Sequence, residues 1–343
     1  MKKVYVGIDL GSKICAAAAR DEHEEIVDIE VFPTSERNLI AFLERQHGEL
    51  HVLFEEGELA SWAYRALLPH AFCVKVCDAR QNRLIYHGPK DDLRDARDLS
   101  ELAWRGKFKE VHHSDDVEAM AFKLAVKRHQ QLVRAVSRQK VRIKAYFRAQ
   151  GHIYQGKVLY GRRGRVEALS LLENPVARKL VEREYEMMDS LDREKALAEK
   201  MVVDLCRNRP EIEALRRMPG CDYITASRFV AYVADPNRFR SRSAFMSYCR
   251  MAVLHRESNG RSIARERLDR SGVGTLKDTS RKIFDAARRS RGDNGIKRSY
   301  EASLARTQNK THARLSTQRK ILWAMLVIWR DGRVYDDEEF LGA

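Results

Sequence analysis

Apolar and polar residues alternate in short segments along the first third of the chain. Val4, Val6 and Ile8 occupy every second position, which predicts a strand that ends at Asp9. The same pattern predicts further strands over 14–19, 25–32, 51–54 and 72–76, with helices over 38–46, 60–68 and 91–104. This order of elements is typical of a mixed α/β layer whose first three strands form a meander.

The middle of the chain changes to a helical period. Residues 115–150 contain neither Pro nor Gly, and apolar residues recur at helical spacing among many Lys and Arg. Residues 175–207 have the same character and begin with Pro175, which suits a first helical turn. The basic, glycine-rich segment 152–165 between them is expected to be a loop. The pattern predicts an antiparallel coiled-coil hairpin, with an ordinary helical bundle as the alternative.

The last part of the chain is predicted to be mainly α-helical. Within 215–233, Pro219 and Gly220 separate two helical stretches, which resembles a helix-hairpin-helix. Such a hairpin presents backbone N–H groups at a helix N-terminus, so we expect a phosphate contact there. A basic polar stretch follows over 255–274, and closing helices are predicted over 276–289 and 315–329.

These patterns divide the 343 residues into three parts, which agrees with a prior of about 100–200 residues per domain. We expect an α/β domain over 1–110, a helical hairpin over 111–207 and a helical domain over 208–343. Residues 1–110 hold 16 basic and 20 acidic residues, whereas residues 111–343 hold 48 basic and 29 acidic ones. The whole positive excess therefore lies after residue 110, and it predicts a salt-sensitive contact with a polyanion, most commonly nucleic acid.

Several classes of protein are excluded by composition. The longest apolar run, 321–329, is about half of the roughly 20 residues that a membrane span needs. Apolar and other residues alternate over the first eight positions, and the charged Asp9 follows, so this segment does not have the continuous apolar run of a signal peptide. The six cysteines form no zinc-binding pattern, so we expect buried free thiols in a reducing cytoplasm.

Four carboxylates stand at positions that an α/β sheet brings to one edge. Asp9 ends the first strand, Glu55 ends a later one, and Asp92 and Asp95 are three residues apart on one face of a helix start. Hard cations such as Mg²⁺ or Mn²⁺ prefer oxygen ligands of this kind, and they act on phosphodiesters. Each residue alone is typical of a cap, a turn or a solvated helix end, so the combination favours the site.

Five sequence segments carry a resemblance to a known family. VGIDLGS (6–12), FEEG (54–57) and KDDLRDA (90–96) resemble the three acidic motifs of the DEDD transposases of the one-ten insertion-sequence family. Segments 215–251 and 257–272 resemble the hairpin and the serine motif of that family's transposase domain. The resemblance covers nearly the whole chain. It implies a RuvC-like N-terminal domain of RNase H-like fold, a coiled-coil middle and a C-terminal transposase domain.

The resemblance also implies the site residues. It places the family's four acidic residues on Asp9, Glu55, Asp92 and Asp95. Glu55 is preferred to Glu56 because it follows the strand directly, and Asp92 is preferred to Asp91 because the spacing K-x-D-x-x-D-A fits only that register.

A serine is the nucleophile that the resemblance implies. Reading the family's motif without a gap selects Ser258, with Ser262 as the second choice, because Asn259 separates Ser258 from the expected Gly. Four arginines around it are candidates for holding nucleic acid: Arg256, Arg261, Arg265 and Arg267. The implied activity is that of a DNA transposase and serine recombinase, which exchanges strands through a covalent phosphoserine intermediate.

The implied partners are nucleic acids and further copies of the chain. The family's relatives bind target and donor DNA and a structured non-coding guide RNA, the bridge RNA, so that base pairing selects the sequence. The helical middle predicts dimers that pair into a tetramer, as recombination between two duplexes requires, and the resemblance implies that the carboxylates and the serine meet across subunits. It also implies a bacterial, nucleoid-associated protein of the cytoplasm, without a membrane partner.

Other functions stay open at this stage. A RuvC-type junction nuclease would cut by metal-dependent attack of water, and Ser258 would then only contact DNA. An actin-like or sugar-kinase ATPase would use the turn at 7–12 for phosphate, but no second phosphate turn is visible. A non-enzymatic RNA-binding module would leave the four carboxylates unexplained.

Overall fold

The structure is a computed structural model that describes residues 2–78, 91–254, 257–258, 261–262 and 267–342. The chain divides into two compact units, Met1–Asp116 and Val117–Ala343. The helical hairpin belongs to the second unit, and the expected boundary at 207/208 inside that unit stays a prediction.

The first unit is built on a mixed sheet of six strands within the described residues, in the order β3-β2-β1-β4-β5-β6. Their bounds are β1 (Lys3–Leu10), β2 (Ile14–Arg20), β3 (Ile26–Pro33), β4 (Glu49–Glu55), β5 (Cys73–Cys77) and β6 (Glu110–Val111). The first three strands form the predicted antiparallel meander. β4 is parallel to β1, β5 is parallel to β4, and β6 is antiparallel to β5. The two-residue strand β6 was too short to give a periodic signal.

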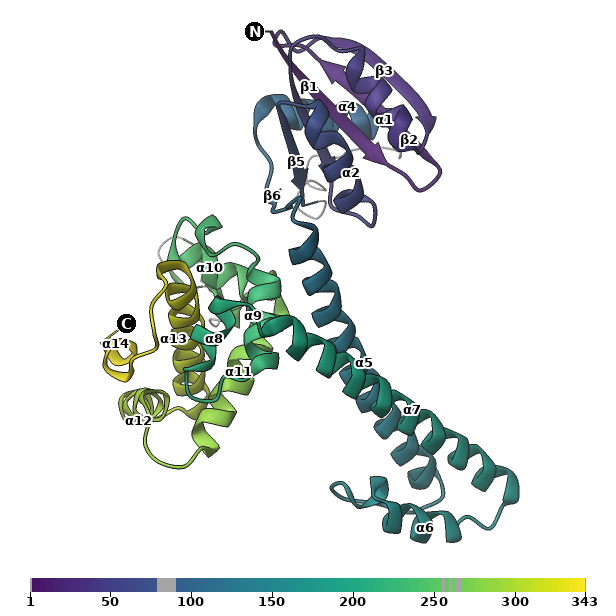
Figure 1. The fold of residues 1–343 in the computed structure, drawn as a ribbon, viewed down its shortest axis with the longest axis vertical. Helices are drawn as coiled ribbons and strands as arrows, with labels where there is room; N and C mark the ends of the chain where they lie inside the picture. Colours follow the sequence, from purple (N-terminus) through teal and green to yellow (C-terminus); the bar gives the residue numbers. More distant parts are fainter. Residues whose placement is uncertain (1, 79–90, 255–256, 259–260, 263–266, 343) are drawn as a thin grey trace. The chain divides into compact units, whose positions relative to one another are not determined.

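Helices cover both faces of this sheet (Figure 1). α1 (Glu36–Glu44) and α2 (Ala60–Leu67), which continues into the single turn η1 (Leu68–His70), pack on one face, and α4 (Asp92–Arg105) packs on the other. Because side chains alternate along a strand, Val4, Val6 and Ile8 face α1 and α2, while the positions between them face α4.

Small residues let α4 lie close to the sheet. Ala16 and Ala18 on β2 pack against Ala96. At Gly7 a Cβ atom would lie 2.7 Å from the carbonyl carbon of Leu99 and closer still to other backbone atoms of α4. The helix therefore contacts the bare backbone of β1 at this position.

The second unit begins with two long antiparallel helices, α5 (Val117–Ala149) and α7 (Pro175–Cys206). Segment 152–165 between them is not the loop that we expected, because it contains η2 (Val158–Tyr160) and the start of α6 (Arg162–Ser170). Its apolar residues Leu159 and Ala168 complete a small core with Phe147 at the tip of the hairpin. Because Gly and Arg dominate the composition of this segment, its pattern gave no sign that its few apolar residues belong to a core.

The remaining helices form one core with the base of the hairpin. They are α8 (Pro210–Arg216), α9 (Tyr223–Val233), η3 (Pro236–Arg238), α10 (Arg242–Tyr248), α11 (Gly274–Arg289), α12 (Gly295–Thr307), α13 (Lys310–Asp331) and α14 (Asp337–Gly342). Phe122 and Val126 of α5 and Val202 and Cys206 of α7 belong to this core. The hairpin is thus fixed at its base by ordinary apolar packing.

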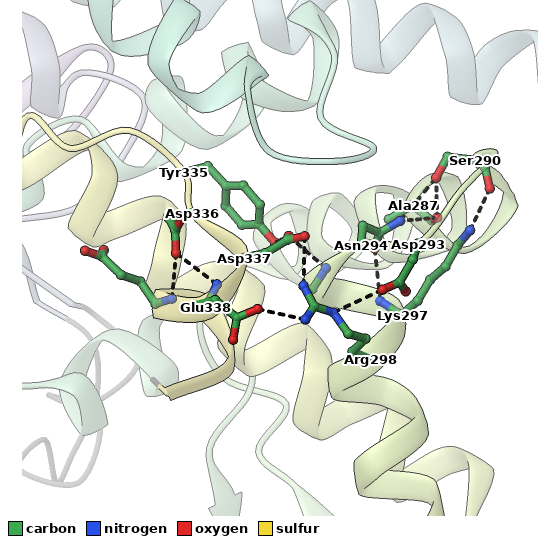
Figure 2. A network of polar contacts seen from close by, with 12 residues as sticks. Ala287, Ser290, Asp293, Asn294, Lys297, Arg298, Tyr335, Asp336, Asp337 and Glu338 are labelled. Atoms are coloured by element: carbon green, nitrogen blue, oxygen red, sulfur yellow. Dashed lines mark hydrogen bonds and ion pairs between the residues drawn. The ribbon is translucent and has the colours of Figure 1, made fainter.

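Three of these α-helices, α10, α12 and α14, were not predicted, and an ion-pair network joins the last two. Figure 2 shows the Arg298 guanidinium between three carboxylates, 2.8 Å from Glu338, 3.1 Å from Asp337 and 3.3 Å from Asp293. The backbone N–H of Gly295 donates to Asp337 over 2.7 Å. The network therefore holds α14 on the start of α12.

Among the described residues no helix is long and apolar enough to cross a membrane. All six cysteines are free thiols, and five of them are buried, with Cys73 partly exposed. Burial raises the pKa of Cys206 to about 11 and that of Cys221 to about 12, so these thiols are protonated and unreactive near neutral pH.

Candidate active site

Asp9 and Glu55 lie side by side at one edge of the sheet. β1 and β4 are parallel, and Ile8 is in register with Phe54, so the next residue of each strand is one of the two carboxylates. Ile8 and Phe54 are buried toward α1 and α2. By the alternation of a strand, Asp9 and Glu55 are on the other face, which α4 covers.

The N-terminal turn of α4 lies at the same edge. Ala16 pairs with Asp9 across β1 and β2. Ala96 packs in the small cluster around Ala16, and Leu93 packs against it. Asp92 and Asp95, which flank Leu93 in the first turn of α4, therefore lie close to the end of β1.

The far end of α4 confirms its direction. The Ser100 hydroxyl accepts a hydrogen bond from Arg20 Nε over 3.4 Å, and Arg20 pairs with Tyr5 near the start of β1. α4 thus runs antiparallel to β1, and its N-terminus, not its C-terminus, lies over the strand ends. The positive end of the helix dipole also favours carboxylates at this turn.

The neighbours of the predicted carboxylates have other partners. Asp91 is the N-cap of α4, and its carboxylate accepts a hydrogen bond from the Leu93 N–H over 3.3 Å. Glu56 forms an ion pair with the ring of His113 over 2.5 Å. The same ring lies 3.5 Å from the hydroxyl of Ser61 on α2, on the face of the sheet away from α4. Sequence reasoning missed His113, since a single His gives no periodic or motif signal.

The four acidic positions lie at one edge of the sheet, but within the described residues their side chains do not form a complete metal-binding site. In the part of the chain that the structure describes, no three His, Cys, Asp or Glu side chains are close enough together to hold an ion. Asp9 and Glu55 both take part in polar or electrostatic interactions. The strand order and the direction of α4 therefore bring the four acidic positions to one edge of the sheet, and their side chains do not form an ion-binding group there.

The candidate serines lie on a small antiparallel ribbon in the second unit. Two strand pairs are described: β7 (Val253–Leu254) pairs with β10 (Arg267–Leu268), which we call the stem, and β8 (Glu257–Ser258) pairs with β9 (Arg261–Ser262). In register, Ser258 is opposite Arg261 and Ser262 is opposite Glu257. Arg267 is exposed on the stem, whereas Arg256 and Arg265 are outside the described residues.

The helix-hairpin-helix is present but does not offer the expected phosphate site. The Asp222 carboxylate accepts a hydrogen bond from the Thr225 N–H over 2.7 Å, and the Thr225 hydroxyl accepts one from the Asp222 N–H over 2.8 Å. This capping box places a negative charge where a phosphate would bind. Gly220 packs against the backbone of α11, so the turn has a structural role.

Two family models match the chain, and they cover these two sites. Residues 6–149 match a DEDD transposase domain, which includes all four predicted carboxylates. Residues 212–299 match the family described as Transposase IS116/IS110/IS902, which includes the serine ribbon. The chain belongs to the IS110 family of transposases. No curated protein matches it significantly.

Membership of this family settles the broad activity. An IS110-family transposase cleaves and joins DNA strands, so the ATPase and the non-enzymatic RNA-binding alternatives are set aside. The mixed sheet of unit 1 is the RNase H-like domain of this transposase, followed by its mostly helical region. A DEDD domain also implies the use of a divalent metal.

Proposed function

We propose that this IS110-family transposase exchanges DNA strands through a covalent phosphoserine intermediate on Ser258. In this proposal Asp9, Glu55, Asp92 and Asp95 hold Mg²⁺ or Mn²⁺. The observation that carries it is the meeting of β1, β4 and the first turn of α4 at one edge of the sheet. Carboxylate oxygens from two strands and a helix are the donor set that a hard divalent cation prefers.

The proposed serine step needs no cofactor to supply energy, because one phosphoester bond replaces another. The Ser258 oxygen forms a bond to the phosphorus of the scissile phosphodiester, and the bond from phosphorus to the leaving DNA oxygen breaks. The serine hydroxyl loses its proton and the leaving oxygen gains one, so the number of phosphoesters is unchanged. A bound divalent ion would polarise the phosphate oxygens. Arginines of the ribbon add positive charge around the phosphate.

The partners follow from charge and exposed surface. The basic excess after residue 110 supports binding of both target and donor DNA and a structured guide RNA. We include a homo-oligomer, dimer to tetramer, because two duplexes must be held together for exchange. Exposed apolar residues along α7 support contact with another copy: Leu180, Met187, Leu197, Met201 and Leu205.

The decisive experiment traps the intermediate. The transposase, its co-purifying RNA and Mg²⁺ are mixed with labelled DNA that spans the junction of the insertion element, and the mixture is denatured. A protein–DNA adduct that S258A loses and S262A retains is the expected result. Loss of the adduct only in S262A would move the nucleophile to Ser262. Metal-dependent nicking that survives both substitutions would instead favour the RuvC-type nuclease that uses water.

The metal site is tested with D9N and D95N in the same assay. Both variants are expected to lose cleavage and keep nucleic-acid binding, because the carboxylates hold the ion and not the DNA. E101Q is the matched control, since Glu101 is on α4 but pairs with Arg105 over 2.7 Å near the other end of the helix. Full cleavage by D9N would contradict the assignment.

A further inference from the structure

A lysine and two arginines interact electrostatically where the serine ribbon leaves the helical core. We define this root cluster as Arg250, which follows α10, Lys277 on α11 and Arg314 on α13. The ribbon begins at the same place, where the Asp269 N–H donates to the Ala252 carbonyl over 2.9 Å. We propose that the root cluster and the N-terminus of α11 bind a phosphodiester that flanks the cleavage site. The location of that cleavage site rests on the function proposed above.

Arg250 is held in place by an unusual backbone conformation. Its φ is +60°, the left-handed region in which glycine or asparagine is favoured after a helix. Its Nε donates to the carbonyl of Arg270, and its Nη1 lies where a Cβ on Gly274 would be only 2.8 Å away. The guanidinium therefore lies over the first residue of α11, and a side chain at Gly274 would displace it. Backbone preference does not explain an arginine here, so the reason lies in its side chain.

Among the residues that the structure describes, the root cluster has no acidic partner. None of its three members forms an ion pair within the described residues. Burial and then the like charges of Arg250 and Arg314 lower the pKa of Lys277, so each arginine disfavours the charged form of this lysine. Nε of Arg314 is buried without a hydrogen-bond partner in the described part of the chain. Such a group of cations is stabilised when an anion binds.

The N-terminus of α11 adds hydrogen-bond donors to the same place. This helix has 16 residues, but Val273 at its N-cap provides no side-chain acceptor and its first turn holds no acidic residue. α9 in contrast is capped by the Asp222 carboxylate. The first N–H groups of α11, which no side chain caps, and the positive end of its dipole therefore act together with the root cluster on an anion.

The short distance along the chain from the root cluster to Ser258 indicates that the anion is part of a nucleic-acid backbone. Ser258 is four residues beyond Leu254, so an extended strand carries it at most about 13 Å further, at about 3.3 Å per residue. That length corresponds to about four nucleotides of one strand, at about 3.4 Å each. The root cluster therefore contacts a phosphate within about four nucleotides of the scissile one, and it sets the position of the strand along the ribbon.

The test measures the salt dependence of binding in EDTA, where cleavage does not interfere. Fluorescence anisotropy follows a labelled DNA duplex and, separately, the co-purifying guide RNA. For the duplex, K277Q and R314Q should each reduce the slope of log affinity against log salt by up to about 0.9, the value for one phosphate contact. K282Q is the matched control, because Lys282 is on the same helix but already pairs with Asp278 over 2.8 Å. Its slope should equal that of the wild type.

R250G separates binding from folding. Glycine suits the left-handed backbone, so the thermal midpoint should not fall while the affinity for the duplex does. A loss confined to the RNA would overturn the assignment to the cleaved DNA, because the bound phosphate would then belong to the guide. Wild-type slopes for K277Q and R314Q on both probes would overturn the proposal. Because no cleavage is measured, failure of Ser258 to form an adduct would leave this result intact.

Discussion

Gly7 sets the distance between β1 and α4, and G7A should disturb both stability and cleavage. A Cβ at this position would lie 2.7 Å from the carbonyl carbon of Leu99, against about 3.5–4.0 Å for an ordinary carbon contact. The obstructing atoms belong to the backbone, so no side chain can rotate away. α4 must therefore move by about 1 Å, and overpacking of this kind destabilises by about 1–3 kcal/mol.

The same movement carries Asp92 and Asp95 away from Asp9. A misplacement of about 1 Å at a catalytic site lowers the rate by about 100-fold. Urea unfolding measures the first effect, and the rate of strand cleavage under saturating DNA measures the second. G57A is the control, because nothing lies within 4 Å of the Cβ that it adds. If G7A unfolded at the wild-type midpoint and cleaved at the wild-type rate, the close approach of α4 and its role in the site would both be refuted.

Two further predictions concern the second unit. Burial and then the charge of Arg228 lower the pKa of His129 in the folded protein. The unfolded chain therefore binds a proton at this residue more readily than the folded chain does. The free energy of unfolding should fall as the pH drops below about 6.5. Urea titrations across that range should show a weaker pH dependence in H129Q, and an identical dependence would contradict the assignment. F147A removes a fully buried ring at the hairpin tip and should destabilise that tip by about 3–5 kcal/mol. Hydrogen exchange should then accelerate over 159–172 and not in α11, whereas uniform acceleration would mean that the tip is not a separate core.

The sheet was predictable because its signal is local. The alternation of Val4, Val6 and Ile8 fixes both the strand and the face that turns toward α1, so the position of Asp9 on the other face follows. The order of the acidic motifs then indicated which strand and helix ends meet. Whether the four side chains surround an ion depends on differences in distance of less than an ångström. The hydrophobic pattern of a sequence carries no information at that precision.

The parts that the sequence analysis missed depend on contacts between distant residues. Leu159 is buried only because the tip of the hairpin folds back on α7, where the Tyr185 hydroxyl donates to its carbonyl. Glu56 and His113 are 57 residues apart, and neither belongs to a repeating pattern. Arg250 and Arg314 come near Lys277 only when α10, α11 and α13 pack. Counting charges detected the basic excess, but it could not show which Lys and Arg side chains form no ion pair among the described residues.

The ion pair of Glu56 with His113 has a mechanical consequence. His113 lies three residues before the boundary at Asp116, on the stretch of chain that leads into α5, and Glu56 is the neighbour of Glu55. The contact therefore ties the chain segment before α5 to the residue next to Glu55. A displacement of that segment is passed to the end of β4, so the position of the Glu55 carboxylate depends on how residues 112–116 are held.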